Sequence, residues 1–179
     1  MKPHHDLTRP SPWVVRFAGL VPAGGVVLDL ACGGGRHSRF FLERGHPITA
    51  VDADVAGMAD LKGRGDVELI LADLEHGPWP FDRQTFPGVV VTNFLWRPVL
   101  PLIVGAVAPG GALIYETFAR GNERFGRPSN PDFLLTDGEL LEAVHGQLGV
   151  VAYECLEVTE PKPAVVQRIA AVRREGEAG

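Results

Sequence analysis

The sequence predicts a single α/β domain in which a doubly wound, mostly parallel sheet of seven strands ends in an antiparallel strand pair. Three observations carry this prediction. Short apolar runs alternate with amphipathic segments, a glycine turn separates the first apolar run from a helix, and a short connection joins the last two runs. With 179 residues, 45% of them hydrophobic, the chain can bury one sizeable core but is too short for a two-domain enzyme.

The first predicted unit is a strand, a glycine turn and a helix. Residues 26–30 are β-rich, the glycines at 33–35 permit a sharp turn, and residues 36–44 form a helix that Gly45 closes. The same rhythm continues with predicted strands at 47–51, 67–71, 88–93 and 112–116 and predicted helices at 55–61 and 99–107.

The C-terminal third is predicted to end the sheet differently. A long loop at 118–135 and a helix at 137–145 precede strands at 150–156 and 165–172. The connection at 157–164 is too short for a helical crossover, so these two strands are expected to pair antiparallel. The predicted organisation is an N-terminal lid segment at 1–25, a main domain at 26–172 and a flexible polar tail at 173–179.

Charge and cysteine content exclude several classes of function. The 22 acidic and 17 basic residues give a net charge of -5, which argues against a broad surface for nucleic acid. No apolar run approaches the length of a membrane span, and the N-terminus lacks a signal-peptide pattern. Cys32 and Cys155 form no metal-binding pattern, so we expect a cytoplasmic protein without a metal site.

In a sheet of this kind, ligands bind beyond the carboxyl ends of the strands. The glycine turn allows close approach of a ligand there, and the helix that follows favours an anion. Asp52 lies 19 residues after Gly33, the spacing at which a carboxylate can accept hydrogen bonds from ribose hydroxyls. The alternative is that the glycines only form a turn and that Asp52 and Asp54 cap the next helix.

Two nucleotide-binding patterns are not matched. Ser38 occupies the third glycine position of the dinucleotide pattern, which weakens an NAD site. No Gly-Lys-Ser or Gly-Lys-Thr follows the turn, which argues against a phosphate-loop ATPase.

The motifs at the strand ends resemble the class I S-adenosylmethionine-dependent methyltransferases, over a range from 26 to 172. They are VLDLACGGG at 27–35, AVD at 50–52, LAD at 71–73 and VTN at 91–93. The stretch RGNERFGRP at 120–128 is similar to a small-molecule, tellurite-resistance-like branch. The resemblance implies a Rossmann-like fold and S-adenosylmethionine as cofactor.

The resemblance also implies roles for individual residues. Asp29 and the glycine turn would hold the methionine end, Asp52 the ribose hydroxyls, Asp73 with Leu74 the adenine, and Asn93 with Phe94 the region of the methyl group. Ala31 stands where many members carry glycine, which predicts altered packing rather than lost binding. The predicted cofactor-binding residues are Asp29, Ala31, Gly33, Gly34, Gly35, Asp52, Ala53, Asp73, Leu74, Asn93 and Phe94. For Asp29, the alternative is a brace for the turn's backbone N–H groups.

The acceptor is expected to be a small molecule, with an anion as one option. Methyl transfer needs a general base only if the acceptor arrives protonated. His4 and His5 could reach the site from the N-terminal segment together with Trp13, or belong to a frayed end. Glu116 could serve as the base or form a salt bridge with Arg120 or Arg124. The candidate catalytic residues are His5, Tyr115, Glu116, Arg124 and Arg127.

The arginines of the loop at 118–135 could contact an anionic acceptor, because the guanidinium fork matches oxyanions. Alternatively they pair with Glu123 and Asp132 inside the loop. Two further readings are an RNA or protein methyltransferase, and a cofactor-binding partner subunit without turnover. The sequence does not specify an oligomeric state.

Overall fold

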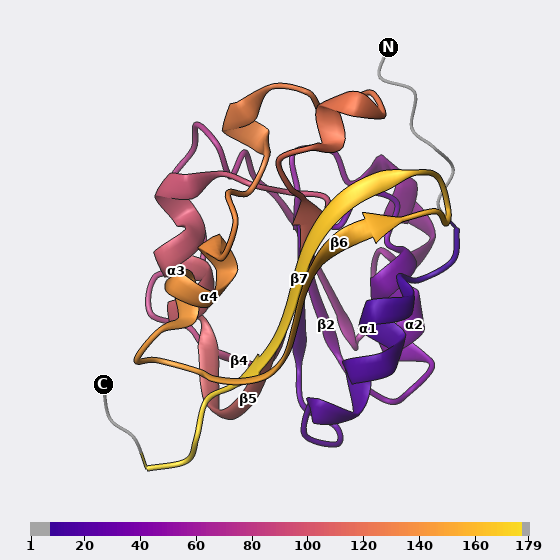
Figure 1. Cartoon of the computed structure of the whole chain (residues 1–179). Helices are drawn as coiled ribbons and strands as arrows, with labels where there is room; N and C mark the ends of the chain where they lie inside the picture. The colour runs from indigo at the N-terminus through magenta and orange to yellow at the C-terminus, as the bar shows by residue number, and fades with distance from the viewer. Residues whose placement is uncertain (1–7, 177–179) are drawn as a thin grey trace.

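A seven-stranded sheet runs through the molecule, with helices on both faces (Figure 1). The computed structural model describes residues 8–176. The strands follow the order β3-β2-β1-β4-β5-β7-β6 across the sheet. They are β1 (Val27–Leu30), β2 (Ile48–Asp52), β3 (Val67–Leu71), β4 (Phe86–Thr92), β5 (Val107–Phe118), β6 (Gly149–Val158) and β7 (Ala164–Val172).

The predicted topology is confirmed. Strands β1 to β5 are parallel, β7 pairs antiparallel with β5, and β6 pairs antiparallel with β7. Strand β1 lies between β2 and β4, so the direction of winding reverses beside it. In doubly wound sheets, this switch point at the carboxyl edge is where ligands bind.

Helices cover the sheet in pairs, α1 (Pro12–Phe17) and α2 (Arg36–Leu42) on one face and α3 (Leu100–Gly105) and α4 (Glu139–Val144) on the other (Figure 1). Alternate strand residues divide the core accordingly: Val89 and Val91 pack on the α3 side, and Val90 packs on the α1 side. Burial on both faces explains why these strands read as nearly continuous apolar runs. Short 3-10 helices occupy Ala18–Leu20, Ala56–Leu61, Arg97–Val99, Asn122–Arg124 and Pro131–Phe133.

Helix α1 was not predicted, and it changes the interpretation of the N-terminal segment. Ser11 caps the helix by accepting the Trp13 N–H at 3.2 Å, and Pro12 fits the first helical position. Trp13 is 2% exposed, and its indole N–H donates to the Ile169 carbonyl at 3.1 Å. The described residues of the predicted lid segment therefore pack into the core, because Trp13 is buried against the sheet.

Among the other differences from the predicted boundaries, one lies at the start of β5 and one in the C-terminal tail. Strand β5 begins at Val107 rather than at 112, with a register shift that leaves Gly88 opposite Ala112. The turn-forming residues 109–111 bulge out of the strand instead of preceding it. Arg173, predicted to belong to a flexible tail, exchanges backbone hydrogen bonds with Gly110 and Gly111 and donates to the Val107 and Val104 carbonyls.

Candidate functional site

The glycine turn joins β1 to α2 at the carboxyl edge of the sheet. Gly33 and Gly35 have φ values of 54° and 82°, a region in which glycine is favoured. A Cβ atom on Gly33 or Gly34 would meet no atom within 4 Å, so the outer surface of the turn faces open space. A Cβ on Gly35 would instead lie 2.8 Å from the Met58 side chain. The Met58 side chain therefore packs against the turn at Gly35, whereas the surface at Gly33 and Gly34 is open, which allows a ligand to approach closely.

Asp52 links the end of β2 to this turn. Its Oδ2 accepts the Gly33 N–H at 2.9 Å, and its Oδ1 accepts the Asp54 N–H at 3.0 Å. Asp54 in turn accepts the Ala56 N–H, so both aspartates also order the start of the next segment. Each carboxylate oxygen has a second lone pair, which leaves half-exposed Asp52 able to accept from ligand hydroxyls.

Asp29 lies beneath the turn and is 3% exposed. Its Oδ2 accepts the Ser38 hydroxyl at 2.6 Å. Burial raises the pKa of Asp29 to about 7, against the opposing effects of the Ser38 hydrogen bonds and of the Arg36 charge. Asp29 therefore braces the first part of α2 through Ser38, and its predicted roles toward the methionine end of the cofactor and toward the N–H groups of the turn stay predictions.

Asp73 and Leu74 follow β3. Asp73 Oδ1 accepts the backbone N–H groups of Glu75 and His76 at 2.9 and 3.0 Å, which lowers the pKa of this carboxyl. Leu74 is buried in the core, whereas Ala53, after β2, is exposed. Because β2 and β3 are parallel neighbours, residues 52–53 and 73–74 lie at the same edge of the sheet, where the adenosine is predicted to bind.

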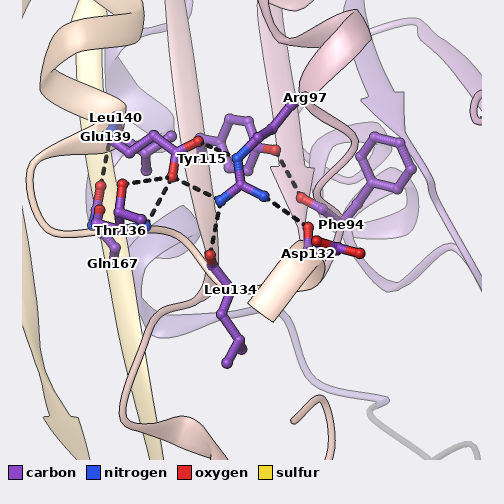
Figure 2. Close-up of polar contacts among 9 residues, drawn as sticks. All are labelled: Phe94, Arg97, Tyr115, Asp132, Leu134, Thr136, Glu139, Leu140 and Gln167. Atoms are coloured by element: carbon purple, nitrogen blue, oxygen red, sulfur yellow. Dashed lines mark hydrogen bonds and ion pairs between the residues drawn. The ribbon is translucent and has the colours of Figure 1, made fainter. Parts of the chain in front are cut away.

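Asn93 and Phe94 follow β4, the strand on the other side of β1. Asn93 has a φ of 54°, and its N–H donates to the Glu116 carbonyl at 3.0 Å. The Tyr115 hydroxyl donates to the Phe94 carbonyl at 2.7 Å (Figure 2). Tyr115 is fully buried, and burial raises its pKa well above the usual range. Tyr115 therefore braces this loop, and its buried hydroxyl, which donates to the Phe94 carbonyl, does not favour a role as general base.

Arg97 holds the segment after β4 to the loop that follows β5. Its guanidinium donates to both carboxylate oxygens of Glu139, at 2.7 and 3.0 Å, and to the carbonyls of Asp132 and Leu134, each at 2.9 Å (Figure 2). Glu139 also accepts the N–H and hydroxyl of Thr136. Sequence reasoning gave this residue no role, and the only local signal for it was that Pro98 follows it at the start of the 3-10 helix Arg97–Val99.

Glu116, at the carboxyl end of β5, lies in a polar cluster. Its Oε1 accepts the Ser11 hydroxyl at 2.7 Å, and its Oε2 pairs with Arg168 at 3.0 Å. The predicted salt bridge to Arg120 or Arg124 is therefore wrong, because Arg168 on the neighbouring strand β7 is directly opposite Glu116 in register. Each oxygen of Glu116 therefore already has a partner inside this cluster.

His37, which sequence reasoning also missed, belongs to the same cluster. Its Nε2 accepts the Ser11 N–H at 3.0 Å, and its Nδ1 lies 3.5 Å from the Thr92 hydroxyl. Burial lowers the pKa of His37 to about 3, so the ring is neutral at physiological pH. The ring joins the N-terminal segment to α2 and to the end of β4.

The remaining predicted residues are less closely tied to the turn. Arg124 pairs with Glu157 at 3.0 Å rather than with Glu123 or Asp132, and Arg127 is exposed. His4 and His5 lie outside the described residues. Within residues 8–176, no group of His, Cys, Asp and Glu side chains could hold a metal ion. No helix of that range is long and apolar enough to cross a membrane.

Known proteins similar to this chain share both its sequence motifs and its fold. The family described as "Methyltransferase domain" matches residues 27–111. A malonyl-[acyl-carrier protein] O-methyltransferase of Salmonella typhimurium is 32% identical over 103 residues, covering 54% of this chain and 40% of that protein. The chain therefore spans less than half the length of the curated relatives it matches.

Two solved structures show the same fold over almost the whole chain. The 1,6-didemethyltoxoflavin-N1-methyltransferase of Burkholderia thailandensis, with bound S-adenosylhomocysteine, has a TM-score of 0.70 at 21% identity and covers 96% of this chain and 80% of its own. TehB from Haemophilus influenzae has a TM-score of 0.71 at 20% identity, over 93% of this chain and 63% of its own. Residues 27–111 therefore match a methyltransferase domain, and the chain shares the fold of these two methyltransferases over almost its whole length.

Proposed function

We propose that this chain transfers a methyl group from S-adenosylmethionine to a small-molecule acceptor. The observation that carries the proposal is the glycine turn, which is open in front and linked to Asp52 at the switch point of the sheet. A Cβ at either outer glycine would occupy space that a ligand needs, and Asp52 retains lone pairs for ribose hydroxyls.

The residues present fit the cofactor. The methionine end would lie against Gly33–Gly35 above Asp29, the ribose at Asp52, and the adenine beside Ala53, Asp73 and Leu74. Asn93 and Phe94 would border the methyl group from the end of β4. When bound, S-adenosylmethionine supplies an activated methyl group on a sulfonium, whose loss leaves a neutral thioether.

The contribution of the chain is then chiefly to hold the two reactants in position. An acceptor placed about 3–3.5 Å from the methyl carbon and in line with the breaking bond gains most of its rate from orientation. The described candidates for a base are already engaged: Tyr115 donates its proton inward, Glu116 is paired, and His37 accepts a backbone N–H. This arrangement favours an acceptor that arrives unprotonated.

A small acceptor is supported by the site and by the named relatives. The described connections at the carboxyl edge are turns and one long loop, with no inserted domain to grip a macromolecule. The curated relative is named for malonyl-[acyl-carrier protein], and the Burkholderia structure contains 1,6-didemethyltoxoflavin. The 20% identity to TehB leaves membership of a tellurite-resistance-like branch a prediction.

The test is production of S-adenosylhomocysteine by purified protein given S-adenosylmethionine and a panel of carboxylates, thiols, phenols, amines and inorganic oxyanions. We expect turnover with at least one small acceptor, lost in Asp52→Ala and retained in Asp66→Ala, whose side chain is exposed and remote from the turn. Turnover only with RNA or protein, with salt-sensitive binding, would contradict the small-molecule assignment. Cofactor binding without turnover on any acceptor would instead indicate a non-catalytic partner subunit.

A further inference from the structure

Helix α3 is a surface helix without a single polar side chain. Its sequence is LPLIVG, and the uncharged stretch around it extends over residues 98–115. The other α-helices within residues 8–176 all carry charged side chains. Half of the α3 residues pack into the core, and the outward half consists of Pro101, Leu102 and Gly105. A helix that is apolar on all sides is normally buried, so we expect a second surface to cover this one.

The outward side of α3 continues into a groove beside α4. The groove has a volume of about 340 Å³, and its lining includes Leu100 and Pro101 of α3 and Ala143 of α4. Figure 1 shows the two helices on the face of the sheet opposite α1 and α2. The surface formed by Pro101, Leu102, Gly105 and Ala143 is called the α3 face below. Leu102 at its centre is 42% exposed, which is a large exposure for a leucine on a helix.

Charged groups of opposite sign lie at the two ends of α3. Glu142 is exposed and lines the groove beside Leu100 and Pro101, near the start of the helix. Arg173 lies at the other end, where its guanidinium donates to the Val104 and Val107 carbonyls at 3.0 and 2.8 Å.

These two charges are not balanced by their neighbours. Within residues 8–176, neither Glu142 nor Arg173 forms an ion pair. Arg97 also lines the groove, but Glu139 already neutralises its charge at 2.7 Å. The α3 face therefore has an unpaired acid at one end and an unpaired base at the other.

We propose that the α3 face is the contact surface between two copies of this chain, related by a two-fold axis that passes beside Leu102. Such an axis makes the two α3 helices antiparallel, so Glu142 of each copy approaches Arg173 of the other. Two ion pairs of opposite sign then flank the apolar centre, and the helix dipoles oppose each other favourably. Gly105 has open space around its Cα, which permits close approach of the helices.

This charge pattern favours a second copy over an unrelated partner, because a surface with opposite charges at its two ends is complementary to itself under a two-fold rotation. The contact is small, since α3 has only six residues. We therefore expect a reversible dimer with a Kd of about 1–100 μM. The inference does not depend on the proposed function, because the glycine turn leads into α2 on the opposite face of the sheet.

Sedimentation velocity over about 1–300 μM protein tests the proposal. The variants are Leu102→Glu, Glu142→Arg and the double variant Glu142→Arg/Arg173→Glu. Val15→Glu is the matched control, because Val15 is 44% exposed but lies on α1 at the opposite face of the sheet. Thermal denaturation of each variant monitors folding.

We expect wild type and Val15→Glu to dimerise alike as concentration rises. Leu102→Glu should weaken the dimer about tenfold or more, because it places two like charges beside the axis. Glu142→Arg should weaken it less, and the added Arg173→Glu should restore dimerisation by bringing opposite charges together again.

Chemical cross-linking tests the position of the axis. Leu102→Cys is made in a Cys155→Ser background, because Cys155 is exposed whereas Cys32 is buried. A short bismaleimide should join two copies of this variant, since a residue beside a two-fold axis lies close to its own copy. Val15→Cys in the same background should not be joined efficiently.

The proposal is overturned if wild type stays monomeric over the whole concentration range, in which case a different partner covers the α3 face or nothing does. It is also overturned if Leu102→Glu and Val15→Glu dimerise equally well, because the two copies then meet at another surface. If the double variant does not fold, Leu102→Glu and the cross-link at position 102 decide the question. Binding of S-adenosylhomocysteine should be the same in wild type and Leu102→Glu, so the outcome is separate from that of the proposed function.

Discussion

Asp29 is a carboxyl group whose burial opposes its ionisation. Its pKa is raised from 3.8 to about 7, so between these pH values the folded chain holds a proton that the unfolded chain has lost. Unfolding then releases a proton, and the contribution of this group to stability falls as pH rises toward 7. Asp29→Asn removes that dependence while keeping an acceptor for Ser38.

The expected result is that Asp29→Asn gains about 2–3 kcal/mol of unfolding free energy relative to wild type between about pH 5 and about pH 8. Urea denaturation at both pH values measures it. Asp66→Asn is the control, because hydrogen bonding to Arg64 lowers the pKa of this exposed carboxyl and moves its titration below the window. A difference between Asp29→Asn and wild type that is the same at both pH values would contradict the assignment.

Ala31 adopts a left-handed backbone conformation, with a φ of 55°. This conformation costs an L-residue about 1–2 kcal/mol, and glycine avoids the cost at the expense of more entropy in the unfolded chain. Ala31→Gly should therefore raise the unfolding free energy by about 0.5–1 kcal/mol. Ala59→Gly, at an exposed site without positive φ, should lower it. Equal losses in the two variants, measured by chemical denaturation, would show that the turn is not strained.

Tyr115 supports the backbone of the Asn93–Phe94 loop from within the core. Tyr115→Phe removes the hydrogen bond to the Phe94 carbonyl and should cost about 1 kcal/mol of stability. Methyl transfer should stay within a few-fold of wild type, whereas loss of a general base typically costs about 100-fold or more. Initial rates and thermal denaturation of the same preparations distinguish the two roles.

At the scale of a residue, the sequence predicted which side chains follow each strand but not what they contact. Asp52 and Gly33 meet as their spacing implies. The partner of Glu116 could not be predicted, because Arg168 is 52 residues away and several arginines closer in sequence could have served. The role of His37 depends on burial, which spacing alone does not reveal.

At the scale of an element, Arg97 connects the loop after β5 and the start of α4 to the segment after β4. Arg97→Gln removes up to four hydrogen bonds and should cost about 2–4 kcal/mol of stability. Backbone amides at 132–139 should exchange with deuterium faster in the variant. Arg83→Gln, an exposed arginine, serves as control. Unchanged exchange at 132–139 would show that packing alone holds this loop.

The strands were predictable because burial on both faces makes each an apolar run bounded by turn residues. Helix α1 was not, since six residues with a proline carry almost no helical periodicity, and its stability comes from Trp13 and Val14 packing into the core. The start of β5 was misplaced for a related reason. Residues 109–111 have turn chemistry, but here they form an irregularity within a strand.

At the scale of the whole molecule, the order of strands places the open glycine turn, Asp52 and the end of β4 at one edge of the sheet. The fold, and the edge of the sheet that carries the candidate site, were predictable from the sequence. Alternating strands and helices with right-handed connections allow only a few arrangements. The polar cluster behind the turn was not, because it joins Ser11, His37, Glu116 and Arg168 from four separate segments. The loop carrying Arg120, Arg124 and Arg127 lies over this end of the molecule (Figure 1).

The central claim is that this edge binds S-adenosylmethionine through the glycine turn and Asp52, and calorimetry with S-adenosylhomocysteine tests it most directly. We predict saturable binding with a Kd in about the micromolar range, greatly weakened in Asp52→Ala, partly kept in Asp52→Asn and unchanged in Asp66→Ala. NAD should not compete. If folded wild-type protein shows no binding, or if Asp52→Ala binds as tightly as wild type, the glycine turn is not the cofactor site and the account is contradicted.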